Sequence, residues 1–183
     1  AINTGDSMYA LAYLAMLRLG LRGVPEGKIL RATRVLTHTC LLLCEGQYLD
    51  LSYGKLSEIT LQDYLVMVTR KTGELLGAAA QVGALVGTDD DEMVERLYGF
   101  GKELGVAFQI RDDIMGIWGE EEKTGKPKYE DVLNRKKTLP VICGWQKSAG
   151  EDREMLSSLY GRQTMSAKDA EQVEGILRRT GAW

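Results

Sequence analysis

Apolar residues recur along this chain at helical spacing, in long runs separated by short polar or glycine-containing turns. The first run predicts a helix over residues 7–19, which ends at Gly20. Its N-terminal cap is expected among three polar side chains that come before the run, those of Asn3, Thr4 and Asp6. After a turn over residues 21–25, the pattern predicts a second helix from about residue 26 to residue 50.

Polar pairs at capping spacing predict the starts of the later helices. A capping-box-like pair at residues 60–63 precedes a helix that is expected to run to about residue 86. Asp89, with Glu92 one turn further on, favours the start of one long helix that reaches about residue 118. Two final helices are expected to start at residues 148–151 and 166–169.

The composition supports a single helical domain. The chain has 183 residues, of which 44% are hydrophobic, and this is enough to bury one sizeable core. It contains only 3 prolines and is rich in leucine, alanine and methionine, which favours helices over a sheet. We therefore expect an all-α fold in one domain over residues 1–183. The net charge of −3 and the lack of a basic, aromatic-interleaved patch argue against nucleic acid as a partner.

Two features of the sequence bear on the location of the protein. The longest early apolar run, residues 8–17, is too short to cross a bilayer, so we expect no stable membrane insertion. The three cysteines are an odd number in a chain without a visible secretory signal, which favours reduced thiols and a cytoplasmic location. Cys40 and Cys44 lie one helical turn apart among leucines, and we expect them to pack in the core.

Two adjacent carboxylates interrupt an apolar helical stretch at residues 108–119, which reads FQIRDDIMGIWG. At helical spacing, Gln109, Asp112, Asp113 and Gly116 fall along one side of this helix. A charged pair on a core-like helix is costly to bury unless a cation compensates it, and carboxylate oxygens favour Mg²⁺. The alternative is a solvated edge of a long helix.

A lysine-bearing loop follows this helix directly. Among the lysines of residues 120–140, those expected within reach of the acidic helix end are Lys126, Lys128, Lys136 and Lys137. Carboxylates next to such a loop suit a phosphate ester held between a metal ion and ammonium groups.

In several ordered segments the chain resembles the trans-type isoprenyl diphosphate synthases, also called polyprenyl synthetases. FQIRDDIMG resembles the second aspartate-rich motif of that family, and TGKP, Asp131 and KKTLP resemble the segment that follows it. Three earlier segments are similar to the family in its own order: INTGDSMYALA, EGQYLDL and YLVMVTRKTGELLGAA. The resemblance is detailed from Ile2 to about Leu139 and looser up to Ala182.

The resemblance implies an isoprenoid-synthase-type helical bundle with a central apolar cavity. Residues 1–183 would form one partial polyprenyl synthetase domain, and the N- and C-terminal helices of the family are expected to be missing. Its first aspartate-rich motif, which lies upstream of the INTGD segment, does not occur in these residues. Gly116 also stands where many members have a final aspartate.

The resemblance also assigns roles to individual residues. It implies catalytic roles for Lys71, Thr72 and Gln109 and metal ligation by Asp112 and Asp113. The residues it implies for substrate binding are Gln47, Asp50, Lys71, Lys126 and Lys136.

The activity implied is Mg²⁺-dependent condensation of an allylic diphosphate with isopentenyl diphosphate to a longer trans-polyprenyl diphosphate, through ionisation, attack and loss of a proton. Family members pair through their early helices, so a homodimer is expected. Two alternatives remain: a class I terpene cyclase of the same fold, and a non-catalytic subunit that modulates an active synthase. Because the first aspartate-rich motif is absent, we expect these residues alone to be inactive.

Overall fold

The computed structural model describes residues 2–54, 59–120, 122, 125 and 127–182, and every regular element in these residues is a helix. This confirms the all-α prediction. The chain divides into two compact units: unit 1 comprises residues 1–46 and 69–105, and unit 2 comprises residues 47–68 and 106–183. Two of the boundaries fall within the long helices α2 (Glu26–Tyr53) and α5 (Asp91–Trp118), and each unit is described by itself. The expectation of a single domain stays a prediction.

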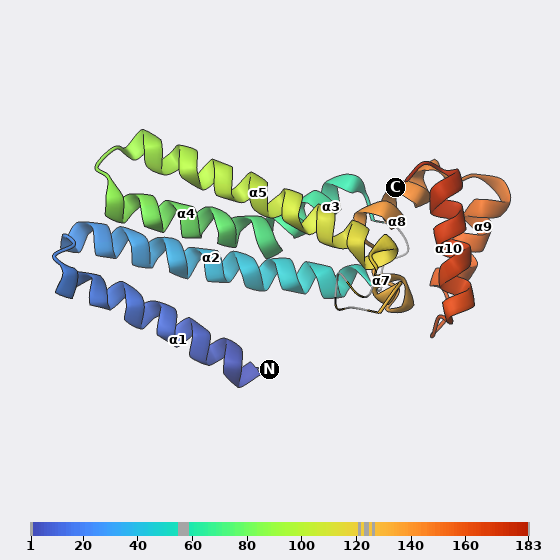
Figure 1. The fold of residues 1–183 in the computed structure, drawn as a ribbon, viewed down its shortest axis with the longest axis horizontal. Helices are drawn as coiled ribbons and strands as arrows, with labels where there is room; N and C mark the ends of the chain where they lie inside the picture. Colours follow the sequence, from blue (N-terminus) through green and yellow to red (C-terminus); the bar gives the residue numbers. More distant parts are fainter. Residues whose placement is uncertain (1, 55–58, 121, 123–124, 126, 183) are drawn as a thin grey trace. The chain divides into compact units, whose positions relative to one another are not determined.

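Unit 1 contains α1, α4 and the larger parts of α2 and α5 (Figure 1). Two short helical turns, η1 and η2, also belong to it. The bounds of these elements are α1 (Ile2–Arg18), the 3-10 helix η1 (Leu19–Arg22), α2 (Glu26–Tyr53), the π-helix η2 (Thr69–Gly73), α4 (Glu74–Gly87) and α5 (Asp91–Trp118). Helices α4 and α5 bury Ala84, Leu85 and Val94, against which Val35 of α2 packs.

Glycines let α4 and α5 approach closely. A Cβ atom on Gly101 would stand 2.5 Å from the Leu76 carbonyl oxygen, and one on Gly77 would stand 2.9 Å from the Tyr98 ring. Values under about 3.0 Å are not sterically possible without movement. Glycine lowers the intrinsic stability of a helix. In α4 the small residues offset this cost by allowing close packing against α5.

The starts of two helices in unit 1 differ from the predictions. Helix α1 begins at Ile2, so Asn3, Thr4 and Asp6 lie inside it and do not cap it. Helix α5 begins at Asp91, and its cap is Asp90 rather than Asp89, because the Asp90 carboxylate accepts hydrogen bonds from the Glu92 and Met93 amides at 3.0 and 3.1 Å. Several adjacent acids can each fill a cap position, so spacing alone did not decide between them.

The helix expected from residue 60 to about residue 86 is interrupted. Helix α3 (Leu61–Val68) ends where the π-helix η2 begins, and α4 follows it directly. The capping box is confirmed: the Asp63 amide donates to Thr60 Oγ1 at 3.1 Å, and the Thr60 amide donates to the Asp63 carboxylate at 3.0 Å. The π-helical turn has no sequence signal as distinct as a cap.

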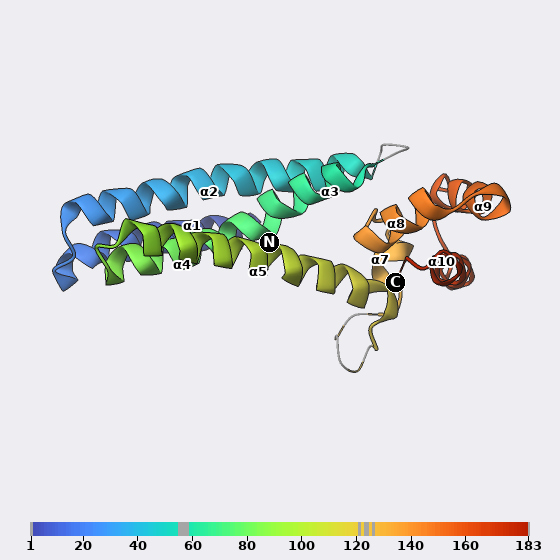
Figure 2. The same ribbon diagram turned by 90° about the horizontal axis from the view of Figure 1, so that it is seen from above.

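Among its described residues, unit 2 contains the end of α2, helix α3, the end of α5 and four further helices. The shorter helices are α7 (Glu130–Leu133), α8 (Leu139–Lys147), α9 (Gly150–Tyr160) and α10 (Ala167–Arg179). Helices α8, α9 and α10 gather together in this unit (Figures 1 and 2). The core of these helices includes Val141, Leu156, Leu159, Val173 and Leu177.

A second apolar cluster in unit 2 surrounds α3. Tyr64, Met67 and Val68 are buried there with Ile142 of α8. The predicted capping box Ser166–Asp169 starts α10 as expected. The expected start at Ser148 is wrong, because Ser148 ends α8, where its hydroxyl donates to the Trp145 carbonyl oxygen at 3.0 Å, and α9 begins at Gly150.

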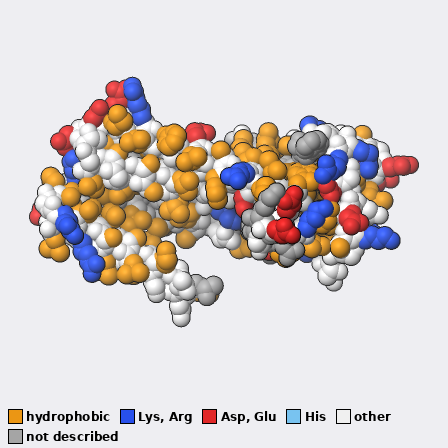
Figure 3. Space-filling model, in the orientation of Figure 1, with side chains coloured by type: hydrophobic (Ala, Val, Ile, Leu, Met, Phe, Trp, Pro, Cys, Tyr) orange, Lys and Arg blue, Asp and Glu red, His pale blue; other side chains and the backbone are white. Residues whose placement is uncertain are grey.

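Unit 1 exposes many large apolar side chains, which Figure 3 shows in orange over the long helices. Helix α1 has no buried residue, and Met8, Leu11 and Leu17 are each more than half exposed. Cys44 is exposed, so the expected core packing of the cysteine pair is wrong for that residue. No helix among the described residues is long and apolar enough to span a membrane.

The capping box of α10 gives a first testable prediction. Replacing Ser166 with alanine removes the hydroxyl that accepts the Asp169 amide, and is expected to lower the free energy of unfolding by about 1 kcal/mol. Ser158→Ala, on the exposed face of α9, is the matched control and is expected to stay within about 0.5 kcal/mol of the wild type. Urea unfolding followed by circular dichroism measures both values, and equal loss in the two variants would contradict the cap assignment.

Candidate functional site

The carboxylate of Asp113 is the centre of a buried polar cluster in unit 2. Its side chain lies on α5 and only 5% of its surface is exposed. It accepts hydrogen bonds from the Tyr64 hydroxyl of α3 at 2.8 Å and from the Gln109 amide of α5 at 3.0 Å. The backbone amide of Leu139, at the start of α8, donates to it at 3.2 Å. Both carboxylate oxygens therefore have protein donors, from three helices.

Two opposing effects act on the pKa of Asp113. Burial raises the pKa because it penalises the charged form, and the negative charge of Asp131 adds to this. The hydrogen bonds from Gln109, Tyr64 and Leu139 oppose the rise, because they stabilise the carboxylate. The net direction is upward. Burial, followed by the charge of Asp113, also raises the pKa of the Tyr64 hydroxyl, which keeps it a donor.

A second buried carboxylate, Asp131 of α7, pairs with Lys136. The Lys136 ammonium lies 2.9 Å from Asp131, whose surface is only 7% exposed. Burial opposes the charge on Lys136, but the hydrogen bond and charge of Asp131 outweigh it and raise the pKa of the lysine. Lys136 is therefore a stable ammonium group at neutral pH.

Gly116 makes room for the Asp131 side chain. A Cβ atom at position 116 would overlap the Asp131 carboxylate oxygen and stand 2.8 Å from its Cγ atom. The Asp131 side chain thus occupies the space that a side chain at position 116 would need.

The other predicted residues of unit 2 lie on the last turns of α2 and on α5. Asp50 is half-buried, and its negative charge acts on both Tyr64 and Lys136. Gln47 is exposed one turn before it. Asp112 is half-buried beside Asp113. Within unit 2, the structure thus gathers Asp50, Gln109, Asp113 and Lys136 into one electrostatic cluster.

The predicted residues Lys71 and Thr72 belong to unit 1. Both are half-buried and lie in the π-helical turn η2. Turns of this kind are rare and occur frequently at functional sites. Lys126 lies outside the described residues.

Two residues of the cluster were not predicted as site residues. Tyr64 was named only as the first residue of the family-like segment YLVMVTRKTGELLGAA, and Asp131 only as part of the segment that follows the carboxylate pair. A tyrosine among buried apolar residues indicates that its hydroxyl group needs a hydrogen-bond partner. No spacing rule connects it to Asp113, 49 residues further on.

The donor chemistry of the cluster fits Mg²⁺ in one particular way. No group of three or more His, Cys, Asp or Glu side chains able to hold a metal ion occurs among the described residues. Mg²⁺, however, is usually held by one or two carboxylates together with phosphate oxygens and water. Asp112 and Asp113 offer two carboxylates of that kind, of which Asp113 already accepts three hydrogen bonds from protein donors.

Two buried polar atoms near these residues have no hydrogen-bond partner within the described part of the chain, Thr138 Oγ1 and Trp118 Nε1. Thr138 is only 3% exposed and precedes Leu139, whose amide binds Asp113. Buried unpaired hydroxyls are uncommon, because each costs about 1–3 kcal/mol. At the N-terminal end of α8, the Thr138 hydroxyl is thus buried without a hydrogen-bond partner among the described residues.

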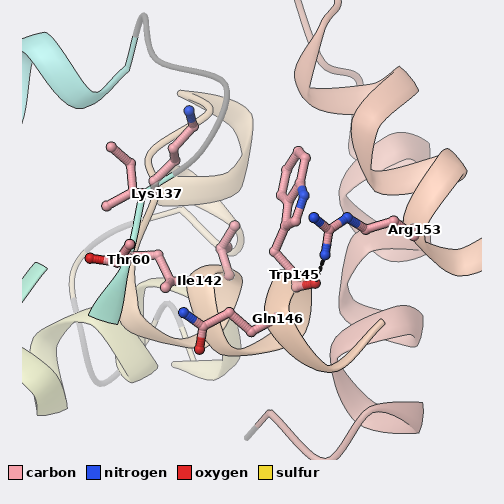
Figure 4. Close-up of a pocket in the computed structure, with 8 residues that line it drawn as sticks. Thr60, Lys137, Ile142, Trp145, Gln146 and Arg153 are labelled. Carbon is pink, nitrogen blue, oxygen red and sulfur yellow. Dashed lines mark hydrogen bonds between the residues drawn. The ribbon is translucent and has the colours of Figure 1, made fainter. Parts of the chain in front are cut away.

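A separate small pocket in unit 2 includes Lys137, one of the lysines predicted to lie near the acidic helix end, and none of the predicted catalytic or metal-binding residues. It has a volume of about 120 Å³ and is lined by Thr60, Ile142, Trp145 and Arg153, among others. Figure 4 shows the Arg153 guanidinium beside Trp145, whose carbonyl oxygen it binds at 2.6 Å. Lys137 also lines it, and burial lowers the pKa of this lysine.

Comparison with known proteins gives a consistent result. The sequence profile of the polyprenyl synthetase family matches residues 1–177. A geranylgeranyl diphosphate synthase of Mycobacterium tuberculosis is 37% identical over 181 residues, which cover 99% of this chain and 51% of that protein. A geranylfarnesyl diphosphate synthase of Natronomonas pharaonis is 38% identical over 158 residues, covering 86% of this chain and 45% of the relative. The chain spans about half the length of the curated relatives it matches.

Solved structures agree with the sequence comparison. A polyprenyl synthetase from Streptomyces coelicolor A3(2) superposes with a TM-score of 0.86 at 32% identity. The match covers 99% of this chain and 54% of that one. The all-α fold is thus that of solved polyprenyl synthetase structures.

The buried Asp113 cluster leads to a prediction on pH dependence. Tyr64→Phe removes one donor to a buried carboxylate and is expected to cost about 1.5–3 kcal/mol of unfolding free energy at pH 7. The hydrogen bond lowers the pKa of Asp113, so it stabilises the ionised form more than the protonated form. The cost is therefore expected to shrink as the pH falls and Asp113 becomes protonated in the folded state.

Urea unfolding of the wild type and of Tyr64→Phe between pH 4 and pH 8 measures this difference. Tyr48→Phe is the matched control, because the Tyr48 side chain is largely exposed. A cost for Tyr64→Phe that is constant over this range would show that the hydroxyl does not interact with the charge on Asp113.

The close approach at Gly116 gives a third prediction. Gly116→Ala is expected to displace Asp131 and lower the free energy of unfolding by about 1–3 kcal/mol. In an Asp131→Ala background the same substitution is expected to cost clearly less, because the clashing carboxylate is gone. Gly99→Ala, where a Cβ atom would meet open space, is the control. Equal costs of Gly116→Ala in both backgrounds would contradict the packing of Asp131 against Gly116.

Proposed function

This chain belongs to the polyprenyl synthetase family, and we propose that it acts in Mg²⁺-dependent condensation of an allylic diphosphate with isopentenyl diphosphate. The product would be a longer trans-polyprenyl diphosphate. The observation that carries the proposal is the juxtaposition in unit 2 of the Asp113 cluster with the Lys136 ammonium group, on helices that match the family over residues 1–177. The names of the relatives, geranylgeranyl and geranylfarnesyl diphosphate synthases, agree with chain elongation.

Asp112 and Asp113 are the proposed holders of the metal ion. When bound, Mg²⁺ would neutralise negative charge on the diphosphate leaving group. Asp113 is buried and accepts three hydrogen bonds, so its carboxylate is fixed in position, and Asp112 is its more exposed neighbour on α5. Fixed carboxylates suit a site in which charge develops, because they need no rearrangement during the reaction.

The lysines are the proposed direct contacts to diphosphate. Lys136 keeps its charge, because Asp131 raises the pKa of its ammonium group, and a lysine has further N–H donors besides the one that faces Asp131. Lys71 is proposed to bind diphosphate and Thr72 to lie near the reacting carbon. Gln109, which donates to Asp113, orients that carboxylate. Gln47, Asp50 and Lys126 complete the proposed substrate-binding set.

A terpene cyclase or a modulating subunit is less well supported. Against a cyclase, TGKP with Lys136 and Thr138 resembles the condensing enzymes. Against a modulating subunit, the chain retains the proposed catalytic and metal-binding residues. The relatives reported above are named for synthases that build prenyl diphosphates. Product analysis with and without isopentenyl diphosphate separates a cyclase from a condensing enzyme, because only the latter needs this second substrate.

We further propose that the chain forms a homodimer through α1 and α2. The support is the set of large apolar side chains that α1 exposes, among them Met8, Leu11 and Leu17. An apolar face of this kind is typical of an interface between subunits. Light scattering at micromolar concentration measures the oligomeric state directly, and a monomer would contradict the proposal.

A cytoplasmic location also remains a proposal, supported by the three free cysteines.

The diphosphate assignment gives the fourth prediction. In millimolar Mg²⁺, Asp112→Ala and Lys71→Ala are each expected to weaken diphosphate binding by about 1.5–3 kcal/mol, or roughly 10- to 150-fold, because each removes a charge-assisted contact. Chelation of the metal with EDTA is expected to weaken binding by the wild type and to remove most of the difference between wild type and Asp112→Ala.

Isothermal titration calorimetry with inorganic pyrophosphate measures these affinities. The controls are Asp6→Ala, which changes the net charge as Asp112→Ala does, and Lys168→Ala, which changes it as Lys71→Ala does. Both control positions are exposed. If Asp112→Ala and Lys71→Ala both bound pyrophosphate as tightly as the wild type, with or without Mg²⁺, the result would contradict the assignment of these residues to diphosphate binding.

A further inference from the structure

The turn that carries Lys71 and Thr72 is a π-helix, Thr69–Gly73, set between α3 and α4. A π-helix has i to i+5 hydrogen bonds and appears mostly as a single turn, because its geometry is less favourable than that of an α-helix. Each residue of an α-helix turns the chain by about 100°. If the π-helical turn changed to α-helical geometry, the side chains within it and after it would therefore point in other directions. The direction of Lys71 and Thr72 thus depends on what keeps the turn in its π form.

Helix α2 lies against the backbone of this turn at Gly46. A Cβ atom on Gly46 would stand 2.7 Å from the Lys71 Cα atom and 2.8 Å from the Arg70 carbonyl carbon, and it would be closer still to the Lys71 nitrogen. Gly46 is buried. The preceding residue adds a side-chain contact, since the Glu45 carboxylate lies 3.3 Å from the Arg70 guanidinium.

Helix α5 lies against the other end of the same turn at Gly105. A Cβ atom there would stand 2.8 Å from the Gly73 Cα atom and 3.1 Å from the Thr72 carbonyl oxygen. As at Gly46, the atoms that approach are backbone atoms, which cannot rotate away as a side chain can. Other glycines of the same two helices differ: Gly27 of α2 and Gly99 of α5 face open space.

We propose that Gly46 and Gly105 are positioning residues that hold the π-helical turn in place and thereby fix the direction of Lys71 and Thr72. The inference rests on the proposed function, because it takes Lys71 as a diphosphate-binding group. It goes beyond that function by assigning a role to two residues that carry no functional group. The absence of a side chain is what each contributes, because only glycine lets two helices contact this turn through its backbone.

The test uses residues 1–183, with inorganic pyrophosphate in millimolar Mg²⁺ as the probe. Gly46→Ala and Gly105→Ala are expected to weaken pyrophosphate binding about tenfold or more, while helix content stays near that of the wild type. Gly27→Ala and Gly99→Ala place the same methyl group on the same helices in open space, and are expected to bind within about twofold of the wild type. Amide hydrogen exchange over residues 69–73 is expected to quicken in the first pair only.

A double-mutant cycle separates positioning from a general loss of stability. In a Lys71→Met background, Gly46→Ala is expected to cause little further loss of pyrophosphate affinity, because the residue it positions is gone. A loss as large as in the wild-type background would overturn the proposal. So would wild-type affinity in folded Gly46→Ala and Gly105→Ala.

A third variant covers the case in which Gly46→Ala does not fold. Glu45→Gln removes the ion pair with Arg70 without adding atoms, and is expected to weaken binding about threefold and to quicken exchange over residues 69–73. Unchanged binding and exchange in Glu45→Gln and in Gly105→Ala would overturn the proposal. Wild-type affinity in Lys71→Met would instead overturn the assignment of Lys71 itself, so failure of the two proposals is distinguishable.

Discussion

The buried carboxylate of Asp113 is the constraint around which the candidate site of unit 2 is arranged. An ionised carboxylate in an apolar setting is costly unless donors surround it, and the structure supplies donors from α3, α5 and the start of α8. These three contacts fix how the three helices meet, and the apolar residues around Tyr64 and Ile142 fill the space between them. The buried polar contacts and the apolar cluster therefore specify the same arrangement.

Unit 1 depends on a different kind of contact. Its glycines allow helices to meet backbone to backbone, at Gly101 against Leu76 and at Gly105 against Gly73. Close approach of this type leaves little freedom, because backbone atoms cannot move independently of the helix that contains them. Helices that contact the π-helical turn through its backbone restrict the directions of the side chains that this turn carries.

The sequence predicted the helical character of the chain and most of the helix spans, because apolar periodicity is a strong signal over long segments. It also predicted two capping boxes, Thr60–Asp63 and Ser166–Asp169, since their members lie close together in the chain. The cap at Asp90 was missed by one residue, because three adjacent acids compete for it. The π-helical turn was missed because a five-residue change of pitch leaves no clear periodic signal.

The candidate site shows the same limit more sharply. The carboxylate pair and the lysines could be named from the sequence as candidates. Two of the three partners of Asp113 could not, since Tyr64 and Leu139 lie 49 and 26 residues away from it. Gly116 looked like a lost ligand in the sequence, and only the fold shows that Asp131 fills the space beside it. Contacts between distant segments follow from packing, which local patterns do not encode.

In the proposed function, residues 1–183 supply the diphosphate-binding side of a condensing site, with one aspartate-rich motif and its lysines. A condensation assay on residues 1–183 alone, with radiolabelled isopentenyl diphosphate and an allylic diphosphate at millimolar Mg²⁺, tests this division of the site. Ionisation needs positive charge on both sides of the leaving group, so we expect little or no labelled polyprenyl product. Substantial turnover by these residues alone would contradict it, because one metal-binding motif would then suffice.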